Sequence, residues 1–190
     1  IRSSQEAVAY MKELHKIVTY LDVSDGEMSQ GSLRCDANVS IRKKGETDLG
    51  TRTEIKNINS FKFIEKAIEY EVKRQISVLE SEKNVEQETR LYDSVKNETR
   101  PMRSKEFAND YRYFPEPDLL PVVITDKEID EIKKHFPEMP EEKSIRYVQE
   151  FGINEGDSSI IANSKSLSKF FEDWVEIVDD KVLLAKILVG

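Results

Sequence analysis

The stretch LRCDANVSIR, residues 33–42, alternates apolar and polar side chains over ten consecutive positions. Side chains on a β-strand point to opposite faces in turn, so this period of two predicts a half-buried strand. The polar face would carry Arg34, Asp36, Asn38, Ser40 and Arg42. Aspartate and asparagine are poor strand formers, and an ordinary solvated face contains more threonine, lysine and glutamate. This face therefore has two interpretations, a solvent-exposed surface or the floor of a polar site.

A second strand is predicted over residues 51–58, after a Gly-containing loop at 43–50 that is typical of a hairpin. Its charged side chains are Arg52, Glu54 and Lys56. An antiparallel hairpin would bring them beside the polar face of the first strand. Carboxylates mixed with arginine and lysine suit a site for phosphate and a divalent metal, because carboxylate oxygen binds metal and the cations neutralise phosphoryl charge.

Helices are expected on both sides of this hairpin. Ser3 and Glu6 have the spacing of a capping box before a helix. Asn59 and Ser60 precede a long apolar-periodic helix that ends near Glu80. This junction is either a plain helix cap or a place where the first backbone N–H groups hold an anion. Further strands are expected at Val85–Leu91, Thr99–Arg103 and Leu119–Ile124.

After residue 124 the pattern becomes helical. Thr125 and Glu128 form a second capping-box spacing, and helices are expected near 126–136, 141–151, 157–163, 165–177 and 180–190. The sequence therefore predicts an α+β unit with an antiparallel sheet over residues 1–124. A small all-α unit is predicted over residues 125–190.

Composition and charge narrow the functional classes. The chain has 190 residues and a net charge of −8, and residues 114–190 hold 17 acidic against 9 basic side chains. An acidic surface repels phosphate backbones, so the basic stretches before residue 114 are the better candidates for nucleic-acid contact. One cysteine and two histidines exclude a disulfide framework, a thiolate metal cage and a histidine metal motif. With no membrane-length apolar run and no signal peptide, a cytoplasmic protein is expected, or an organelle-matrix protein in a eukaryote.

The segment KEFANDYRYFPEPD, residues 105–118, is rich in aromatic side chains between charged ones. Tyr111 and Arg112 could stack on a nucleotide base or on the end of a tRNA. The other interpretation is a structured loop whose aromatic side chains lie in the core. The segment alone does not decide between the two.

Four blocks together resemble one family. They are SDGEMSQGSLRCDANVSIR at 24–42, TEIKNINSFKFIEKAIEYEVKRQ at 53–75, QETRLYD at 87–93 and MRSKEFANDYRYFPEPDLLP at 102–121. In this order and spacing they resemble the B subunit of the tRNA-dependent aspartyl/glutamyl amidotransferase, the GatB family. The resemblance is dense over residues 1–124 and looser afterwards. Gln30 departs from the pattern, because the family usually has glutamate there.

The resemblance implies an ATP-dependent carbon–nitrogen ligase subunit. Its cradle domain is similar in fold to glutamine synthetase and is followed by a helical domain. With ATP and Mg²⁺ it phosphorylates the side-chain carboxylate of misacylated Glu-tRNA(Gln) or Asp-tRNA(Asn). Ammonia made from glutamine by an amidase A subunit then displaces the phosphate, and a small C subunit completes the heterotrimer. The chain would be the second part of the cradle and the first part of the helical domain, consistent with a start at Ile1 and an apolar end.

The same resemblance assigns site residues. Those expected to be catalytic are Arg34, Asp36, Asn38, Glu54, Lys56 and Asn57. Those expected to bind substrate are Asn59, Ser60, Arg90, Arg103, Tyr111 and Arg112. Arg34 and Lys56 would neutralise phosphate charge, and the carboxylates would orient metal, its water or ammonia. No metal ligand is identified from this sequence.

Two other functions fit parts of the sequence. In a non-catalytic module that binds tRNA or a protein partner, the strand face would be a docking surface. A nucleic-acid surface favours lysine and arginine with few acids, whereas phosphoryl transfer needs both signs. A free-standing carboxylate–amine ligase is the third possibility, and the two apparently cut ends argue against it.

Overall fold

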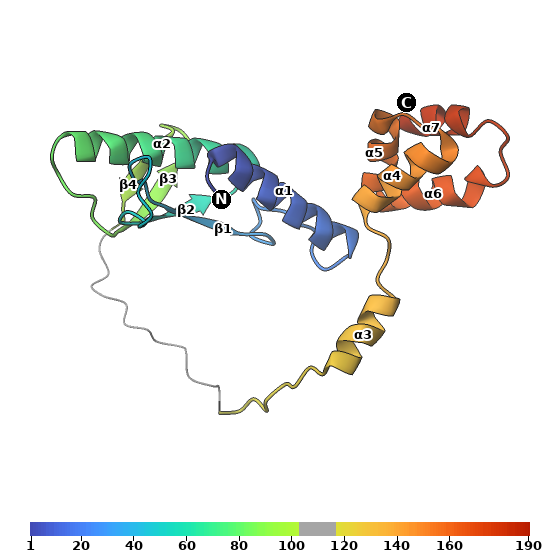
Figure 1. Cartoon of the computed structure of the whole chain (residues 1–190), viewed down its shortest axis with the longest axis horizontal. Helices are drawn as coiled ribbons and strands as arrows, with labels where there is room; N and C mark the ends of the chain where they lie inside the picture. The colour runs from blue at the N-terminus through green and yellow to red at the C-terminus, as the bar shows by residue number, and fades with distance from the viewer. Residues whose placement is uncertain (103–116) are drawn as a thin grey trace. The chain divides into compact units, whose positions relative to one another are not determined.

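The computed structural model describes residues 1–102 and 117–190. These fall into two compact units, Ile1–Ala108 and Asn109–Gly190 (Figure 1). Across the two described ranges the fold is α+β, with one four-stranded sheet and seven helices. The division of the chain into a cradle part and a helical part at residue 124 stays a prediction.

The first unit contains the sheet and two helices. In chain order its elements are α1 (Ser4–Tyr20), β1 (Cys35–Val39), β2 (Thr53–Ile58), α2 (Phe61–Glu80), β3 (Thr89–Asp93) and β4 (Glu98–Pro101). The strands lie side by side in this same order. The predicted hairpin of the first two strands is confirmed, and β3 and β4 form a second antiparallel hairpin.

The expectation of a wholly antiparallel sheet is wrong at the centre, where β2 and β3 run parallel. The reason is the connection between them. The 20-residue helix α2 returns the chain to the end of the sheet at which β2 begins. A crossover of this kind joins parallel strands, whereas a short turn joins antiparallel ones. The alternation of side chains along a strand contains no information about its direction.

Helix α2 packs on one face of the sheet, where it contacts β1, β2 and β4, and α1 packs against α2 (Figure 1). Ile55 and Ile58 of β2 and Val39 of β1 point into this core. The helices contribute Ala7, Met11, Ile64 and Ala67. Both predicted caps are present, because the Ser3 hydroxyl accepts a hydrogen bond from Glu6 N and the Ser60 hydroxyl accepts one from Phe63 N.

The second unit is helical. Its elements are α3 (Asp126–Lys134), α4 (Pro140–Phe151), α5 (Glu155–Asn163), α6 (Lys165–Val175) and α7 (Lys181–Val189). The capping box of Thr125 and Glu128 is confirmed. The core gathers around Tyr147, Ile161 and Phe171. The strand expected at Leu119–Ile124 is wrong: this segment has no regular secondary structure, its apolar side chains are exposed, and it pairs with no described strand.

Candidate functional site

The face of the sheet opposite the helices carries polar side chains in two rows. In one row Asn38 lies opposite Glu54, which lies beside Thr89. In the next row Lys56 lies beside Leu91. Residues in register across strands point to the same side, so both rows share one face. We call this the open face, made of Asp36, Asn38, Glu54, Lys56, Thr89 and Leu91, all exposed or half-buried.

Lys56 lies between two carboxylates on the open face. Its Nζ is 3.5 Å from Asp36 Oδ2 on β1 and 3.5 Å from Glu54 Oε1 on its own strand. Its side chain is 40% exposed. Ion pairs with this much solvent contribute about 0–1 kcal/mol to stability. These two ion pairs of Lys56 therefore add little to the stability of the fold, and its ammonium stays available to an anionic ligand.

The carboxylate of Glu54 has a second partner. Thr89 Oγ1 on β3 donates a 2.8 Å hydrogen bond to Glu54 Oε2, while the other oxygen faces Lys56. The hydroxyl thus restricts rotation of the carboxylate and directs Oε1 toward the ammonium. Sequence reasoning missed Thr89. The parallel pairing that brings it beside Glu54 depends on the α2 crossover, which the strand pattern does not indicate.

Two carboxylates on one face do not by themselves make a metal centre. Mg²⁺ is usually held by one or two carboxylates together with substrate phosphate and water. Among the described residues, no group of three or more histidine, cysteine, aspartate or glutamate side chains could hold a metal ion. The residues described here therefore do not form a metal site by themselves.

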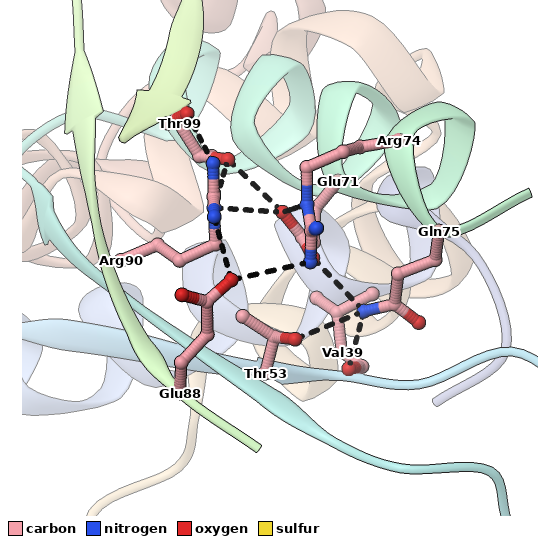
Figure 2. Close-up of polar contacts among 8 residues, drawn as sticks. All are labelled: Val39, Thr53, Glu71, Arg74, Gln75, Glu88, Arg90 and Thr99. Atoms are coloured by element: carbon pink, nitrogen blue, oxygen red, sulfur yellow. Dashed lines mark hydrogen bonds and ion pairs between the residues drawn. The ribbon is translucent and has the colours of Figure 1, made fainter. Parts of the chain in front are cut away.

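On the covered face, polar side chains of α2 join all four strands (Figure 2). We call this group the buried cluster. Its members are Thr53, Glu71, Arg74, Gln75, Glu88, Arg90 and Thr99, together with the Val39 carbonyl. Gln75 Nε2 lies 3.0 Å from the Val39 carbonyl oxygen of β1 and 3.3 Å from the Thr53 hydroxyl of β2. Thr99 Oγ1 of β4 donates to Glu71 at 3.0 Å.

Glu71 is the centre of the buried cluster and is fully buried. Burial alone would raise the pKa of its carboxyl, but hydrogen bonds from Arg74, Gln75 and Thr99 outweigh burial and the pKa lies below its ordinary value. The paired Arg74 has a raised pKa for the converse reason, because Glu71 accepts its hydrogen bonds. Both side chains are therefore charged at neutral pH. The hydrogen bonds and ion pairs of the buried cluster thus hold α2 against the sheet.

Arg90 belongs to the buried cluster and not to the open face. It donates from Nη1 to Glu88 at 2.6 Å, and from Nε and Nη2 to the hydroxyl and carbonyl of Thr99 at 2.8 and 2.7 Å. Only 8% of the residue is exposed. The structure thus places Arg90 on the opposite side of the sheet from Lys56 and gives its guanidinium internal partners. A contact of Arg90 with substrate stays a prediction.

Comparison with known proteins identifies the family. The family model described as the GatB/GatE catalytic domain matches residues 1–130. The chain belongs to the GatB/GatE catalytic domain family. The chain is 54% identical over 190 residues to a protein of Hahella chejuensis that is named as the B subunit of aspartyl/glutamyl-tRNA(Asn/Gln) amidotransferase. The alignment covers the whole chain and 40% of that relative. The proposed resemblance to the GatB family is thus confirmed.

Other GatB relatives give the same result. The B subunits of the same name from Vesicomyosocius okutanii and Thermodesulfovibrio yellowstonii are each 55% identical over 93% of the chain. In both cases the matched part is 37% of the relative. The chain thus spans about two fifths of the length of these relatives. No helix in the described ranges is both long and apolar enough to cross a membrane.

The remaining site residues expected from the GatB resemblance divide into three groups. Arg34 precedes β1 and is exposed. Asn57 is near the end of β2, and Asn59 and Ser60 lie between β2 and α2, where the Ser60 hydroxyl accepts a hydrogen bond from Phe63 N. Residues Arg103, Tyr111 and Arg112 lie outside the described residues. The open face thus brings together Asp36, Asn38, Glu54 and Lys56 from the predicted set.

Proposed function

We propose that the chain supplies part of the carboxylate-activating site in the B subunit of an aspartyl/glutamyl-tRNA amidotransferase. The substrate is misacylated Glu-tRNA(Gln) or Asp-tRNA(Asn). A side-chain carboxylate oxygen attacks the γ-phosphorus of ATP, the bond to ADP breaks, and an acyl phosphate forms. Ammonia then attacks the acyl carbon, phosphate leaves with the electron pair of the broken C–O bond, and a proton is lost to give the amide.

The observation that supports this proposal is the mixture of charges on the open face. Lys56 stands 3.5 Å from two carboxylates on a surface that solvent reaches. A face for nucleic-acid backbone alone would favour cations with few acids. A site that transfers a phosphoryl group to a carboxylate and then admits ammonia needs a cation for the phosphoryl oxygens and a carboxylate to receive protons.

The residues of the open face have distinct proposed roles. Lys56, with Arg34 at the edge of β1, neutralises charge on the transferring phosphoryl group. Asp36 and Glu54 orient the attacking ammonia and accept its proton. Asn38 lies opposite Glu54 and offers an amide to the substrate. In this arrangement the binding of phosphate exchanges the carboxylate partners of Lys56 for phosphoryl oxygens, a ligand that its ammonium binds as a point charge.

ATP is the proposed phosphoryl donor. Magnesium belongs to the same proposal, and because the described residues provide no metal site by themselves, its ligands would have to come in part from elsewhere. The GatB relatives extend well beyond the matched region. We propose that further parts of a longer subunit complete the site, with ammonia from an amidase A subunit and with a small C subunit in the complex.

The test is amide formation on misacylated tRNA by the full-length subunit assembled with its partner subunits. We expect Gln-tRNA(Gln) or Asn-tRNA(Asn) to form only when ATP and glutamine are both present. The alternative is a binding module without catalysis. The complex would then bind tRNA but form no ATP-dependent product, and that result would overturn the proposal.

A further inference from the structure

Asn57 has a backbone conformation that is unusual inside a strand. Its φ is +65°, although its neighbours on both sides pair with β1 or β3 as ordinary strand residues. We infer that Asn57 is a positioning residue for Lys56, acting through its left-handed backbone, and not a group that reacts with substrate. This inference rests on the proposed function of the open face.

The register between β1 and β2 shows what the conformation does. Cys35 pairs with Ile58, whereas Ala37 pairs with Ile55. Between these two pairs β1 has a step of two residues, whereas β2 has a step of three. The extra residue is a β-bulge, and Lys56 and Asn57 together lie opposite Asp36.

The bulge reverses which face of the sheet the residues after it point to. Ile55 is fully buried, so strict alternation from it would turn Asn57 into the core and Ile58 out to solvent. The structure shows the opposite, because Ile58 is 4% exposed and Asn57 is exposed. One left-handed residue therefore allows Lys56 to stay on the open face while the chain still enters α2 with an apolar side chain in the core.

Asparagine suits this position for two reasons. Among residues with a side chain, asparagine and aspartate tolerate the left-handed region best. In addition, Asn57 Nδ2 donates a 3.1 Å hydrogen bond to the Tyr92 carbonyl on β3. The last pair of the β2–β3 ladder is Lys56 with Leu91, so this side-chain bond continues the pairing one step beyond it. The bulge is thus fixed to both neighbouring strands.

The experiment separates backbone conformation from side-chain chemistry. Asn57→Gly keeps access to positive φ but removes the amide, and Asn57→Ala removes both. The matched controls are Asn97→Gly and Asn97→Ala. Asn97 also has a positive φ, +54°, and its side chain is also hydrogen bonded, but it lies in the turn between β3 and β4. All four variants are made in the full-length subunit within its complex, beside Lys56→Ala.

The single-turnover rate of amidation is the first readout. A displacement of about 1 Å in a positioned group can cost about 10²-fold, so we expect a loss of about 10- to 100-fold in Asn57→Ala. Asn57→Gly should stay within about threefold of wild type, because glycine adopts left-handed φ without a steric cost. The amidation rates of the two Asn97 variants should also stay within about threefold of wild type. Hydrogen exchange in residues 35–39 and 53–58 should be faster in Asn57→Ala than in Asn57→Gly, because glycine loses only the side-chain hydrogen bond to the Tyr92 carbonyl.

Two results would overturn the inference. One is an Asn57→Gly variant that is as slow as Asn57→Ala, because the site would then depend on the side-chain amide and not on the left-handed backbone. The other is an Asn57→Ala variant with the wild-type rate while Lys56→Ala is slow. If Lys56→Ala itself has the wild-type rate, the proposed function of the open face has failed, and the effect of Asn57→Ala on hydrogen exchange still tests the bulge.

Discussion

Arg90 Nε lies 3.5 Å from Glu71 Oε2 on the face of the sheet that α2 covers. The next residue along β3, Leu91, points to the open face beside Lys56. Neighbouring residues of β3 thus face opposite sides of the sheet, and each side carries its own group of charged residues. Charges on the covered face have internal partners and hold the fold together, and those on the open face are accessible. The two groups should respond differently to substitution.

Replacing Arg90 should destabilise the first unit strongly. Arg90→Met leaves Glu71 without one of its buried cationic partners, and breaking a buried pair costs about 3–5 kcal/mol. The control is Arg100→Met, because the Arg100 side chain is 54% exposed where it pairs with half-buried Asp93 and Glu98 on the same sheet. Exposed pairs contribute about 0–1 kcal/mol. Urea unfolding followed by circular dichroism measures both variants, and equal losses would contradict the assignment of Arg90 to the buried cluster.

Glu71 should make the first unit sensitive to acid. Its pKa is lower in the folded chain than its ordinary value of 4.5, so the unfolded chain binds more protons as the pH falls. The stabilisation is thus complete above pH 4.5 and is lost as the pH falls toward the folded-state pKa. Glu71→Gln should be less stable at pH 7 but should lose less stability on acidification. The control is Glu80→Gln on the exposed last turn of α2, and an unchanged pH slope in Glu71→Gln would contradict the argument.

Two threonines on opposite faces of the sheet offer a matched comparison. Thr89→Val removes the hydroxyl that directs Glu54, and we expect a slower amidation rate with a change in stability within about 0.5 kcal/mol. Thr99→Val removes a hydrogen-bond partner from buried Glu71 and Arg90 and should cost about 1–3 kcal/mol. Its folded form should keep the wild-type rate. Rate assays combined with urea unfolding test the pair, and a reversed pattern would contradict the division of roles between the faces.

The sequence predicted the open face better than the buried cluster. Strict alternation over residues 33–42 predicts Asp36 and Asn38 on one side, and the structure confirms this within the shorter strand that forms, Cys35–Val39. The order of strands and the parallel pair depend on a crossover that local periodicity does not encode. As a result, the partnership of Thr89 with Glu54 was not foreseen.

The polar residues of α2 were also missed. The buried stripe of the helix continues at helical spacing from Ile64 and Ala67 to Glu71 and Gln75. The stripe does not extend to the last turn of the helix, because Leu79 is 46% exposed. A carboxylate and an amide are buried there because cations and hydroxyls on other strands satisfy them, and those partners become neighbours only in the folded chain.

The helical unit should unfold separately from the sheet. Glu172 of α6 accepts hydrogen bonds from Lys143, Arg146 and Tyr147 of α4 at 2.9, 2.6 and 3.0 Å. Loss of this carboxylate in Glu172→Ala should destabilise the second unit by about 1–3 kcal/mol.

Trp174 is the only tryptophan of the chain and lies on α6, so its fluorescence reports this unit. The control is Glu150→Ala, which removes an exposed carboxylate 3.8 Å from Arg146. Hydrogen exchange in the sheet should be unchanged in both variants. Faster exchange there in Glu172→Ala would show that the two units unfold together.

We propose that Lys56 acts on the phosphoryl group during activation of the tRNA-borne carboxylate. The most direct test is single-turnover amidation of misacylated tRNA at saturating ATP, with Lys56→Ala in the full-length complex and with Lys62→Ala, an exposed lysine on α2, as the control. Loss of one such charge donor costs roughly 10²–10³-fold in rate, and Lys56→Arg should restore only part of it because a guanidinium directs its charge differently. Glutamine hydrolysis by the partner subunit should continue. A wild-type rate in Lys56→Ala would contradict the assignment of Lys56 and of the open face to the site.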